Sequence, residues 1–341
     1  MDKELSGSCI SSVSGYLDFV FSLIKQEKEI IRKRCKKMEA SLSSLEDKLK
    51  GIKNDVEINN FRTIWEVFEK RLKFFKNNIN CLSKQIKFYY RGHSDEKYFL
   101  LPGILRDGKE SKEDFLYNEI QIRNPNVFVN ATYLQKLAIM QHYGCPTRLL
   151  DVTANPLVAL YFACKDTKDE NTGEVIVFAP FEKEILSFDS DKAMILSCLA
   201  KFSKEEKAEI LTKSCEAIAK DEGVLRARCK IVKKLYHELK RENSTFENCI
   251  DPTDVISSFF VQPLKDSERI IKQDGAFVLC GLSIDWEELQ ADLNNFIVER
   301  IKITNKQNIL DELDILGINE ATLFPEVDHV ANYLTKKYLT S

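Results

Sequence analysis

Residues 86–94 read IKFYYRGHS, and they mark the change from a helical to a strand-forming sequence. Apolar residues at 86, 88 and 90 alternate with their neighbours, which is typical of a β-strand, and Gly92 is expected to end it. Arg91 therefore lies at a strand end, where its planar guanidinium can bind a phosphate or carboxylate. Gly92 would let a ligand approach the backbone. The alternative is that Arg91 pairs with a nearby carboxylate for purely structural reasons.

A second block, QHYGCPTRLLDVTANP (141–156), places polar side chains beside glycine and proline. Gly144 and Pro146 end a helix that we predict from about residue 131 to 143. Asn155-Pro156 then begins another helix, with asparagine as the cap and proline in the first turn. His142 lies in the last turn of the first helix. The block is thus a helix end, a forced turn and a helix start in close succession.

Arg148 and Asp151 stand three residues apart in this block, and two interpretations of them are open. They could form a structural pair with each other, or they could line a cleft together with Arg91. Cys145 is a conceivable nucleophile, although no base lies beside it in the sequence.

The first 85 residues form a region of their own in the sequence. Residues 15–85 contain no proline, and apolar residues recur there at helical spacing before and after Gly51. We predict two long helices that form an antiparallel hairpin over 1–85. The basic run RKRCKK (32–37) is either a solvated helix face or a patch that contacts phosphate or a partner.

The remainder, 86–341, alternates strand and helix patterns without a strict βαβ rhythm, which predicts an α+β fold with a mixed or mostly antiparallel sheet and packed helices. Residues 190–250 are helical and charged, and we interpret them as a helical insert. Further strands are expected at 174–179, 259–264, 270–282 and 300–304, and further helices at 111–123, 309–316 and 327–338.

Composition excludes several classes of protein. The chain has 341 residues and a net charge of −3, so its overall charge gives no argument for binding nucleic acid. Its ten cysteines include no CxxC pair, and no metal is predicted. The start is not typical of a signal peptide, and no apolar run is long enough to span a membrane. We therefore expect a cytoplasmic protein with free thiols.

Several blocks, taken in order, resemble the FRG family, which takes its name from an aromatic-Arg-Gly start. They cover roughly 86–335 and are YRG (90–92), QHYG-PTRLLD, NPLVALYFA (155–163), FFVQP (259–263), ERIIKQDGAF (268–277) and TLFPEVDHVANYL (322–334). The resemblance implies a bacterial or phage-associated protein with a role in toxicity or anti-phage defence.

A looser resemblance is to ADP-ribosyltransferases, which also open with an aromatic-Arg-Gly strand. It implies NAD as the cofactor, with Arg91 on a diphosphate or ribose oxygen and Tyr143 or Tyr161 stacked on the nicotinamide. These enzymes finish with a Glu or Gln on a late strand, where this chain has Gln273, with Glu268 five residues earlier. Their Ser-Thr-Ser motif is replaced here by PTRLLD. The carboxylate that offsets the positive charge of the transition state would then come from Asp151, Glu119 or Glu268.

The candidate site residues follow from these blocks and resemblances. The catalytic candidates are Arg91, Asp151, Glu268 and Gln273. The candidates for binding the cofactor are Tyr90, Arg91, Gly92, His142, Tyr143, Thr147, Arg148 and Tyr161.

Two functions are compatible with this sequence. The first is an ADP-ribosyltransferase-like, NAD-binding effector, whose 1–85 helices dock an antitoxin, a defence partner or a second copy of the chain. The second is a non-catalytic sensor or scaffold, in which Arg91, Arg148 and His142 bind the phosphate of a nucleotide or nucleic acid. The sequence contains no GxGxxG, GxxxxGK[ST], GxSxG or HExxH motif, so none of these motifs indicates another enzyme class.

Overall fold

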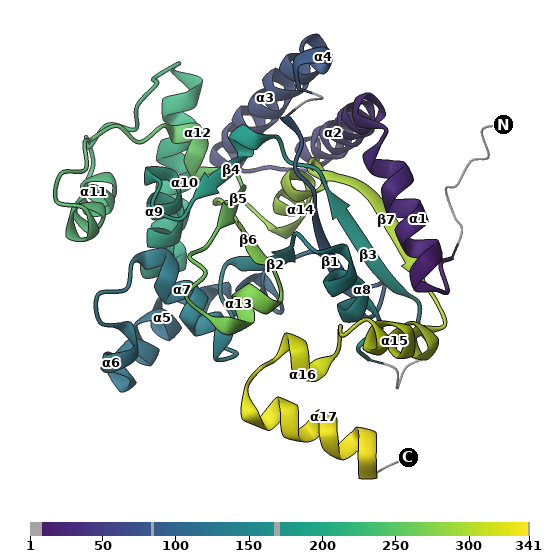
Figure 1. Ribbon diagram of the computed structural model, residues 1–341. Coiled ribbons are helices and arrows are strands. Elements are labelled where there is room, and N and C mark those ends of the chain that lie inside the picture. Colours follow the sequence, from purple (N-terminus) through teal and green to yellow (C-terminus); the bar gives the residue numbers. More distant parts are fainter. Residues whose placement is uncertain (1–8, 83–84, 167–170, 340–341) are drawn as a thin grey trace.

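The computed structural model describes residues 9–82, 85–166 and 171–339, and these form a mixed sheet surrounded by helices (Figure 1). The strand order is β4-β5-β6-β2-β1-β3-β7, and all neighbours are antiparallel except β4 and β5. The strands are β1 (Tyr89–His93), β2 (Leu149–Thr153), β3 (Gly173–Phe178), β4 (Ile185–Ser187), β5 (Phe259–Gln262), β6 (Gly275–Leu279) and β7 (Ile297–Ile303). The predicted α+β fold is confirmed.

The helices follow the order of the chain. They are α1 (Val13–Ile24), α2 (Glu27–Leu49), α3 (Asp55–Asn77), α4 (Ile79–Leu82), α5 (Glu113–Arg123), α6 (Pro125–Phe128), α7 (Tyr133–His142), α8 (Pro156–Cys164), α9 (Asp191–Cys198), α10 (Lys204–Ala219), α11 (Lys230–Glu242), α12 (Pro252–Val255), α13 (Glu268–Lys272), α14 (Trp286–Asn294), α15 (Lys306–Ile315), α16 (Glu320–Leu323) and α17 (Val327–Leu339). No helix in the described ranges has the length and apolar character needed to cross a membrane.

The sheet is divided at its centre. Strand β1 pairs with β3 along its whole length, from Tyr89 opposite Phe178 to His93 opposite Glu174, but it pairs with β2 only where Tyr90 lies opposite Thr153. Strand β2 in turn pairs with β6 over five residues. The sheet is therefore two blocks, β4-β5-β6-β2 and β1-β3-β7, joined at one register position. We call this join the sheet junction.

Alternation along the strands separates the two faces of the sheet. Tyr90, Val175 and Val177 belong to an apolar cluster with residues of α1, α8 and α15, whereas Tyr89 and Phe178 belong to a second cluster with residues 100–101 and α14. Because neighbouring residues of a strand point to opposite faces, these two clusters lie on opposite sides. Both faces are covered over the central strands, and polar side chains there, such as His93 and Glu174, are buried.

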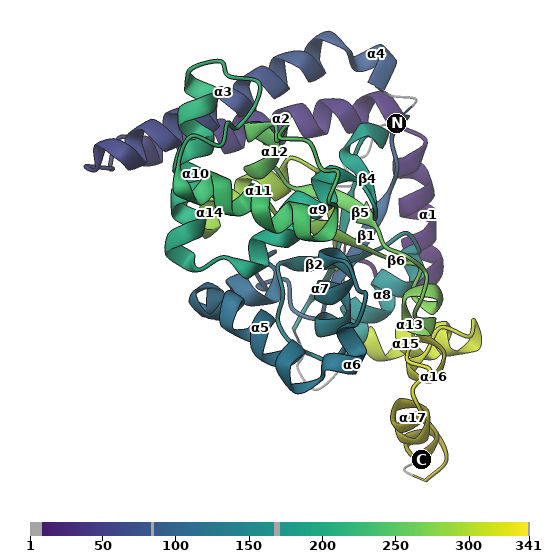
Figure 2. The ribbon, with the colours of Figure 1, turned by 90° about the vertical axis from the view of Figure 1, so that its left-hand side faces the viewer.

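Four helices of the described chain, α1 to α4, precede the sheet, rather than the two predicted. Helices α2 and α3 do form a hairpin, and Figure 2 shows them side by side with α10 next to α3. Their apolar residues join a large core shared with α7, α9 and α10. The basic run 32–37 had two sequence-based interpretations, a solvated helix face or a patch that contacts phosphate or a partner. Both alternatives are wrong for Arg34, because this side chain is completely buried.

The buried guanidinium of Arg34 is stabilised by hydrogen bonds and by contacts with aromatic rings. It donates to both oxygens of Glu184 at 3.0 and 3.2 Å, to the carbonyl of Ala179 at 2.9 Å and to that of Asn295 at 2.7 Å. The rings of Phe75, Phe181 and Phe296 also lie within 5.3 Å of its central carbon. A buried cation is tolerated when it is paired and hydrogen-bonded in this way.

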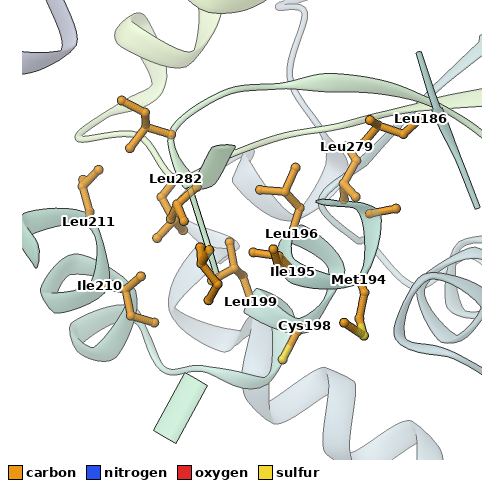
Figure 3. Packing of buried hydrophobic residues seen from close by; sticks show 14 of the residues in the cluster. Leu186, Met194, Ile195, Leu196, Cys198, Leu199, Ile210, Leu211, Leu279 and Leu282 are labelled. Atoms are coloured by element: carbon orange, nitrogen blue, oxygen red, sulfur yellow. The ribbon is translucent and has the colours of Figure 1, made fainter. Parts of the chain in front are cut away.

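The 190–250 segment is helical, as predicted. Within it, a capping box of Ser203 and Glu206 begins α10. Figure 3 shows how its apolar side chains pack: residues of α9 and α10, such as Leu196 and Leu211, lie with Leu279 of β6 and Leu282 in one cluster. These helices therefore share their core with the sheet.

Several strand predictions differ from the structure. The first strand was expected to end at Gly92, but β1 continues to His93, so Arg91 lies inside the strand and not at its end. Residues 270–272 belong to α13 rather than to a strand, and the chain turns at Asp274 (φ 42°) before β6 begins at Gly275. Strand β2 was not predicted, because its alternation (149–153) is hidden among the turn and polar residues on either side. The helix after Asn155-Pro156 is confirmed, with the Asn155 side chain accepting from the amide of Leu157.

Candidate functional site

A cavity of about 550 Å³ opens at the sheet junction, between β1, β2, β6, α7, α8 and α13. Its apolar wall includes Leu134, Ala138, Phe162 and Phe277, and its polar wall includes Arg91, His142, Asp151, Asp266, Arg269 and Gln273. This mixture of apolar surface and a few polar groups is typical of small-molecule sites, and its volume lies in their usual range. We call it the junction cavity.

Arg91 lies where the two blocks of the sheet separate. Its Nη1 donates to the backbone carbonyl of Asp151 at 2.6 Å, and its Nε donates to Nε2 of His93 at 3.1 Å. Burial lowers the pKa of Arg91 to about 10, so the group stays charged at neutral pH. Within the described ranges these two contacts use two of its five N–H groups, and no carboxylate lies within ion-pairing distance. Three donors of a half-buried cation therefore remain for a ligand.

Asp151 sits in the middle of β2 between two buried residues, Leu150 and Val152, and is itself exposed. The pleat places it on the opposite face of the strand from these two side chains. In the part of the chain that the structure describes, its carboxylate forms no ion pair. The Asp151 carboxylate therefore lies unpaired among the described residues, while the backbone carbonyl of the same residue accepts a hydrogen bond from Arg91.

Three further candidate residues, His142, Tyr143 and Gln273, also line the cavity. Tyr143 is 68% exposed, and its ring meets the His142 ring edge-on at 4.9 Å. The Gln273 side chain donates to the carbonyl of Leu323 at 3.0 Å, and its own backbone carbonyl accepts from the Thr153 hydroxyl at 2.6 Å. The amide of Gln273 is therefore already held by the protein.

The C-terminal block contacts residues that line the cavity, although it contributes no lining residue itself. Arg269 lies over the ring of Phe324 at 4.6 Å, and Nε2 of His142 lies 3.8 Å from Oε1 of Glu326. Together with the Gln273 contact, these interactions bring the TLFPEVDHV stretch (322–330) against residues of the earlier blocks. Sequence alone could not show that it meets them here.

Five candidates lie away from the junction cavity: Thr147, Arg148, Tyr161, Glu268 and Glu119. Thr147 and Tyr161 are buried, the first donating to the Gln141 side chain and the second packed in the core around α8. Glu268 is exposed at the start of α13, and Glu119 pairs with Arg123 on α5.

Arg148 is a structural residue, and its predicted pairing with Asp151 is wrong. It is 3% exposed and donates to Glu113 through Nε and Nη2, both at 2.8 Å. Lys207 of α10 reaches the same carboxylate at 2.5 Å. Burial alone would raise the pKa of Glu113, but these two cations lower it to about 2. The ion cluster joins α5, α10 and the residue before β2. These positions are remote in sequence, and this is why no local pattern revealed the cluster.

Gly92 has a different role from the predicted one. A Cβ built on Gly92 would lie 2.5 Å from the amide nitrogen of Ala163 and 2.9 Å from the carbonyl carbon of Phe162, and closer still to the carbonyl oxygen of Ala159. All three belong to the backbone of α8. Although Gly92 borders the cavity, its missing side chain makes room for this helix and not for a ligand. Tyr90, on the same face, is buried below α8, and burial raises its pKa to about 12.

Sequence reasoning missed His93, Asp266 and Arg269. His93 follows the predicted strand end, but its position on the face of Arg91 could have been inferred from the period-two pattern. Asp266 and Arg269 border the cavity because α13 turns the chain towards it, which no local signal predicts. In the described ranges, no group of three or more His, Cys, Asp or Glu side chains could hold a metal ion.

Comparison with known proteins gives one match. The family model described as the FRG domain matches residues 86–172, which supply β1, β2, α7 and α8 of the junction cavity. The remaining walls, from α13 and β6, lie outside the match. No curated protein and no solved structure matches the chain. Residues 86–172 of this chain are therefore an FRG domain.

Proposed function

We propose that the junction cavity binds a dinucleotide of the NAD⁺ type and that the domain is an ADP-ribosyltransferase-like effector. The observation that carries the proposal is Arg91, a half-buried guanidinium at the sheet junction that uses only two of its five N–H groups within the described ranges. Such a group is suited to a diphosphate, because it offers fixed and charged donors.

The other walls of the cavity suit the rest of such a ligand. Leu134, Ala138 and Phe162 offer an apolar surface, and Tyr143 offers an exposed ring on which a nicotinamide or adenine can stack. Asp151 lines the cavity, and its backbone carbonyl accepts a hydrogen bond from Arg91. We assign its carboxylate the role of offsetting positive charge on the ribose. In this reaction the ribose C1–nitrogen bond breaks, nicotinamide leaves with the electron pair, and an acceptor nucleophile bonds to C1.

A non-catalytic nucleotide-binding module is the second candidate, and one observation favours it. The residue expected at the position of the late-strand Glu or Gln of the resembling enzymes is Gln273, which here follows α13, and its amide is already bound to Leu323. Among the described residues that line the cavity there is no glutamate. In this case Arg91 binds the phosphates and no bond is cleaved.

The experiment separates binding from turnover. Affinity for NAD⁺ is measured by calorimetry, and release of nicotinamide by chromatography, for wild type, Arg91→Ala and Asp151→Asn. Arg123→Ala is the matched control, because Arg123 is exposed on α5 and lies outside the cavity. Arg91→Ala should weaken NAD⁺ binding by about 10-fold to 100-fold, since a hydrogen bond to a charged group contributes about 1.5–3 kcal/mol.

The outcomes lead to different conclusions. Release of nicotinamide by wild type that is lost in Asp151→Asn, with binding kept, supports the enzyme. Binding without release in wild type supports the module. If NAD⁺ does not bind to wild type, or if Arg123→Ala loses as much affinity as Arg91→Ala, the proposal is wrong. The effector role is tested separately, by asking whether expression in bacteria is toxic and whether Arg91→Ala abolishes the toxicity.

The 1–85 helices are proposed to dock a partner or a second copy of the chain. Since the apolar residues of α2 and α3 are largely buried in the chain's own core, such docking would use their outer, polar faces.

A further inference from the structure

A line of buried polar groups runs from Arg91 across one face of the sheet. Nε of Arg91 donates to Nε2 of His93 at 3.1 Å, and Nδ1 of His93 lies 3.1 Å from Oε1 of Glu174. Arg300 of β7 donates to the same oxygen of Glu174 at 2.7 Å. His93 and Glu174 are 4% exposed and lie directly opposite each other on β1 and β3. The FRG arginine is thus connected to two neighbouring strands.

The geometry of this line determines the protonation state of His93. A guanidinium can only donate, so Nε2 of His93 must accept from Arg91 with its lone pair. The ring proton of a neutral histidine is then on Nδ1, from which it is donated to Glu174. Only the neutral imidazole with this tautomer satisfies both contacts.

Protonation of His93 would break the first contact. Nε2 would then carry a hydrogen that faces the N–H of Arg91, and two cations would lie 3.1 Å apart in a buried place. Four groups surround the ring in the described structure: Arg91 on β1, Glu174 on β3, Arg300 on β7, and Tyr98, whose ring lies 6.1 Å away. Two of them are cations and only one is an anion.

We propose that His93 is a positioning residue that holds Arg91 in its ligand-binding orientation only while His93 is neutral, so that acid releases Arg91 and weakens anion binding in the junction cavity. This regulation rests on the proposed function, because it presumes that the cavity binds an anion through Arg91. It adds His93, Glu174 and Arg300 to the site, although none of the three lines the cavity.

The electrostatic surroundings of His93 agree with this role. Burial lowers the pKa of His93, and the charges of Arg91 and Arg300 lower it further, while the hydrogen bond to Glu174 opposes them. His93 is therefore neutral at pH 7, and it gains its proton only below the ordinary histidine value of about 6.5. The release of Arg91 is therefore expected only below about pH 6.5.

The test measures affinity between pH 7.5 and 5 by calorimetry, with NAD⁺ and with inorganic pyrophosphate as probes. Wild type should lose affinity by about 10-fold or more over this range, the effect of losing one well-placed charged hydrogen-bond donor. His93→Gln should keep its affinity across the range, because a glutamine amide can accept from Arg91 and donate to Glu174 without titrating. His93→Ala should bind weakly at every pH.

Two further histidine variants identify the titrating group. His237→Gln changes an exposed residue of α11 far along the chain from the cavity and should keep the wild-type pH profile. His142 does line the cavity, so His142→Gln tests the competing explanation. If His142→Gln flattens the profile while His93→Gln retains the acid loss, the proposal is overturned. A wild-type affinity that does not change with pH also overturns it.

A readout without ligand keeps this inference separate from the proposed function. In protein labelled with ¹⁵N-arginine and ¹⁵N-histidine, the NMR signal of the Arg91 Nε–H should shift as His93 titrates, and this shift should be absent in His93→Gln. If neither probe binds wild type at pH 7.5, the proposed function fails, and the NMR titration still decides whether His93 positions Arg91. An Arg91 signal that does not respond to His93 refutes the coupling itself.

Discussion

Substitution of Gly92 by alanine tests whether the glycine of the Arg-Gly pair serves packing or ligand access. The added methyl group would overlap the backbone of α8 at Ala159, Phe162 and Ala163, with distances of 2.9 Å or less to each. Backbone atoms of a packed helix cannot rotate away as a flexible side chain can, so α8 or β1 must shift. Overpacking of this kind costs about 1–3 kcal/mol, and the backbone contacts favour the upper end of that range.

The loss is measured by urea denaturation followed by circular dichroism, together with the melting temperature. At about 2–4 °C per kcal/mol, a loss of about 3 kcal/mol lowers the melting temperature by about 6–12 °C. Gly223→Ala is the matched control: a methyl group added there would meet no atom within 4 Å, and the backbone of Gly223 is not left-handed, so stability should be unchanged or slightly raised.

The result that refutes this reasoning is equal stability of Gly92→Ala and wild type. If stability is kept but affinity for NAD⁺ or pyrophosphate falls, the glycine serves ligand access, as the sequence had suggested. If both variants lose stability equally, the effect is a general one of replacing glycine and does not report on α8.

Three further predictions concern other parts of the fold. Glu113→Gln should cost about 3–5 kcal/mol at pH 7, because Arg148 stays buried without its anion. Since the folded pKa of Glu113 is about 2 and the unfolded one about 4.3, the difference in urea stability from wild type should shrink as the pH falls below 4.3 towards 2, and a constant difference would contradict it. Asn155→Ala should destabilise by about 1 kcal/mol, because α8 loses its cap, and equal midpoints would refute this. Iodoacetamide at pH 8 should modify exposed Cys249 before Cys145, because burial raises the pKa of the Cys145 thiol. Mass spectrometry of the modified peptides checks this order, and earlier modification of Cys145 would contradict the prediction.

Part of the candidate site could be predicted because it is local in sequence. Arg91 follows from the strand pattern that precedes it, and His142 and Tyr143 follow from the helix end at Gly144. Asp151 was selected only as a polar residue after a turn, because β2 itself was not recognised. The structure brings Arg91 and Asp151 together because the sheet opens at their strands.

Arg148 shows why the rest could not be predicted. The sequence around Arg148 is as polar as the sequence around Asp151. Both interpretations of Arg148, a pair with Asp151 and a cleft shared with Asp151 and Arg91, placed it near Asp151. The side chain that binds it is Glu113, thirty-five positions earlier, and the cation that completes the cluster is Lys207. Partner choice for a buried charge depends on which elements the fold brings together, and a single sequence contains no record of that.

By itself, the sequence determined most of the longer helices, most of the strands and the α+β class, because periodicity, caps and breakers act over a few residues. It also indicated the FRG resemblance, expected over roughly 86–335 and matched by the family model at residues 86–172. Tertiary structure alone decided that β1 and β2 separate beside Arg91, that Gly92 accommodates α8, and that His93 connects Arg91 to Glu174. These are contacts between strands and helices far apart in the chain, and they are set by close packing and by the need to satisfy every buried polar group.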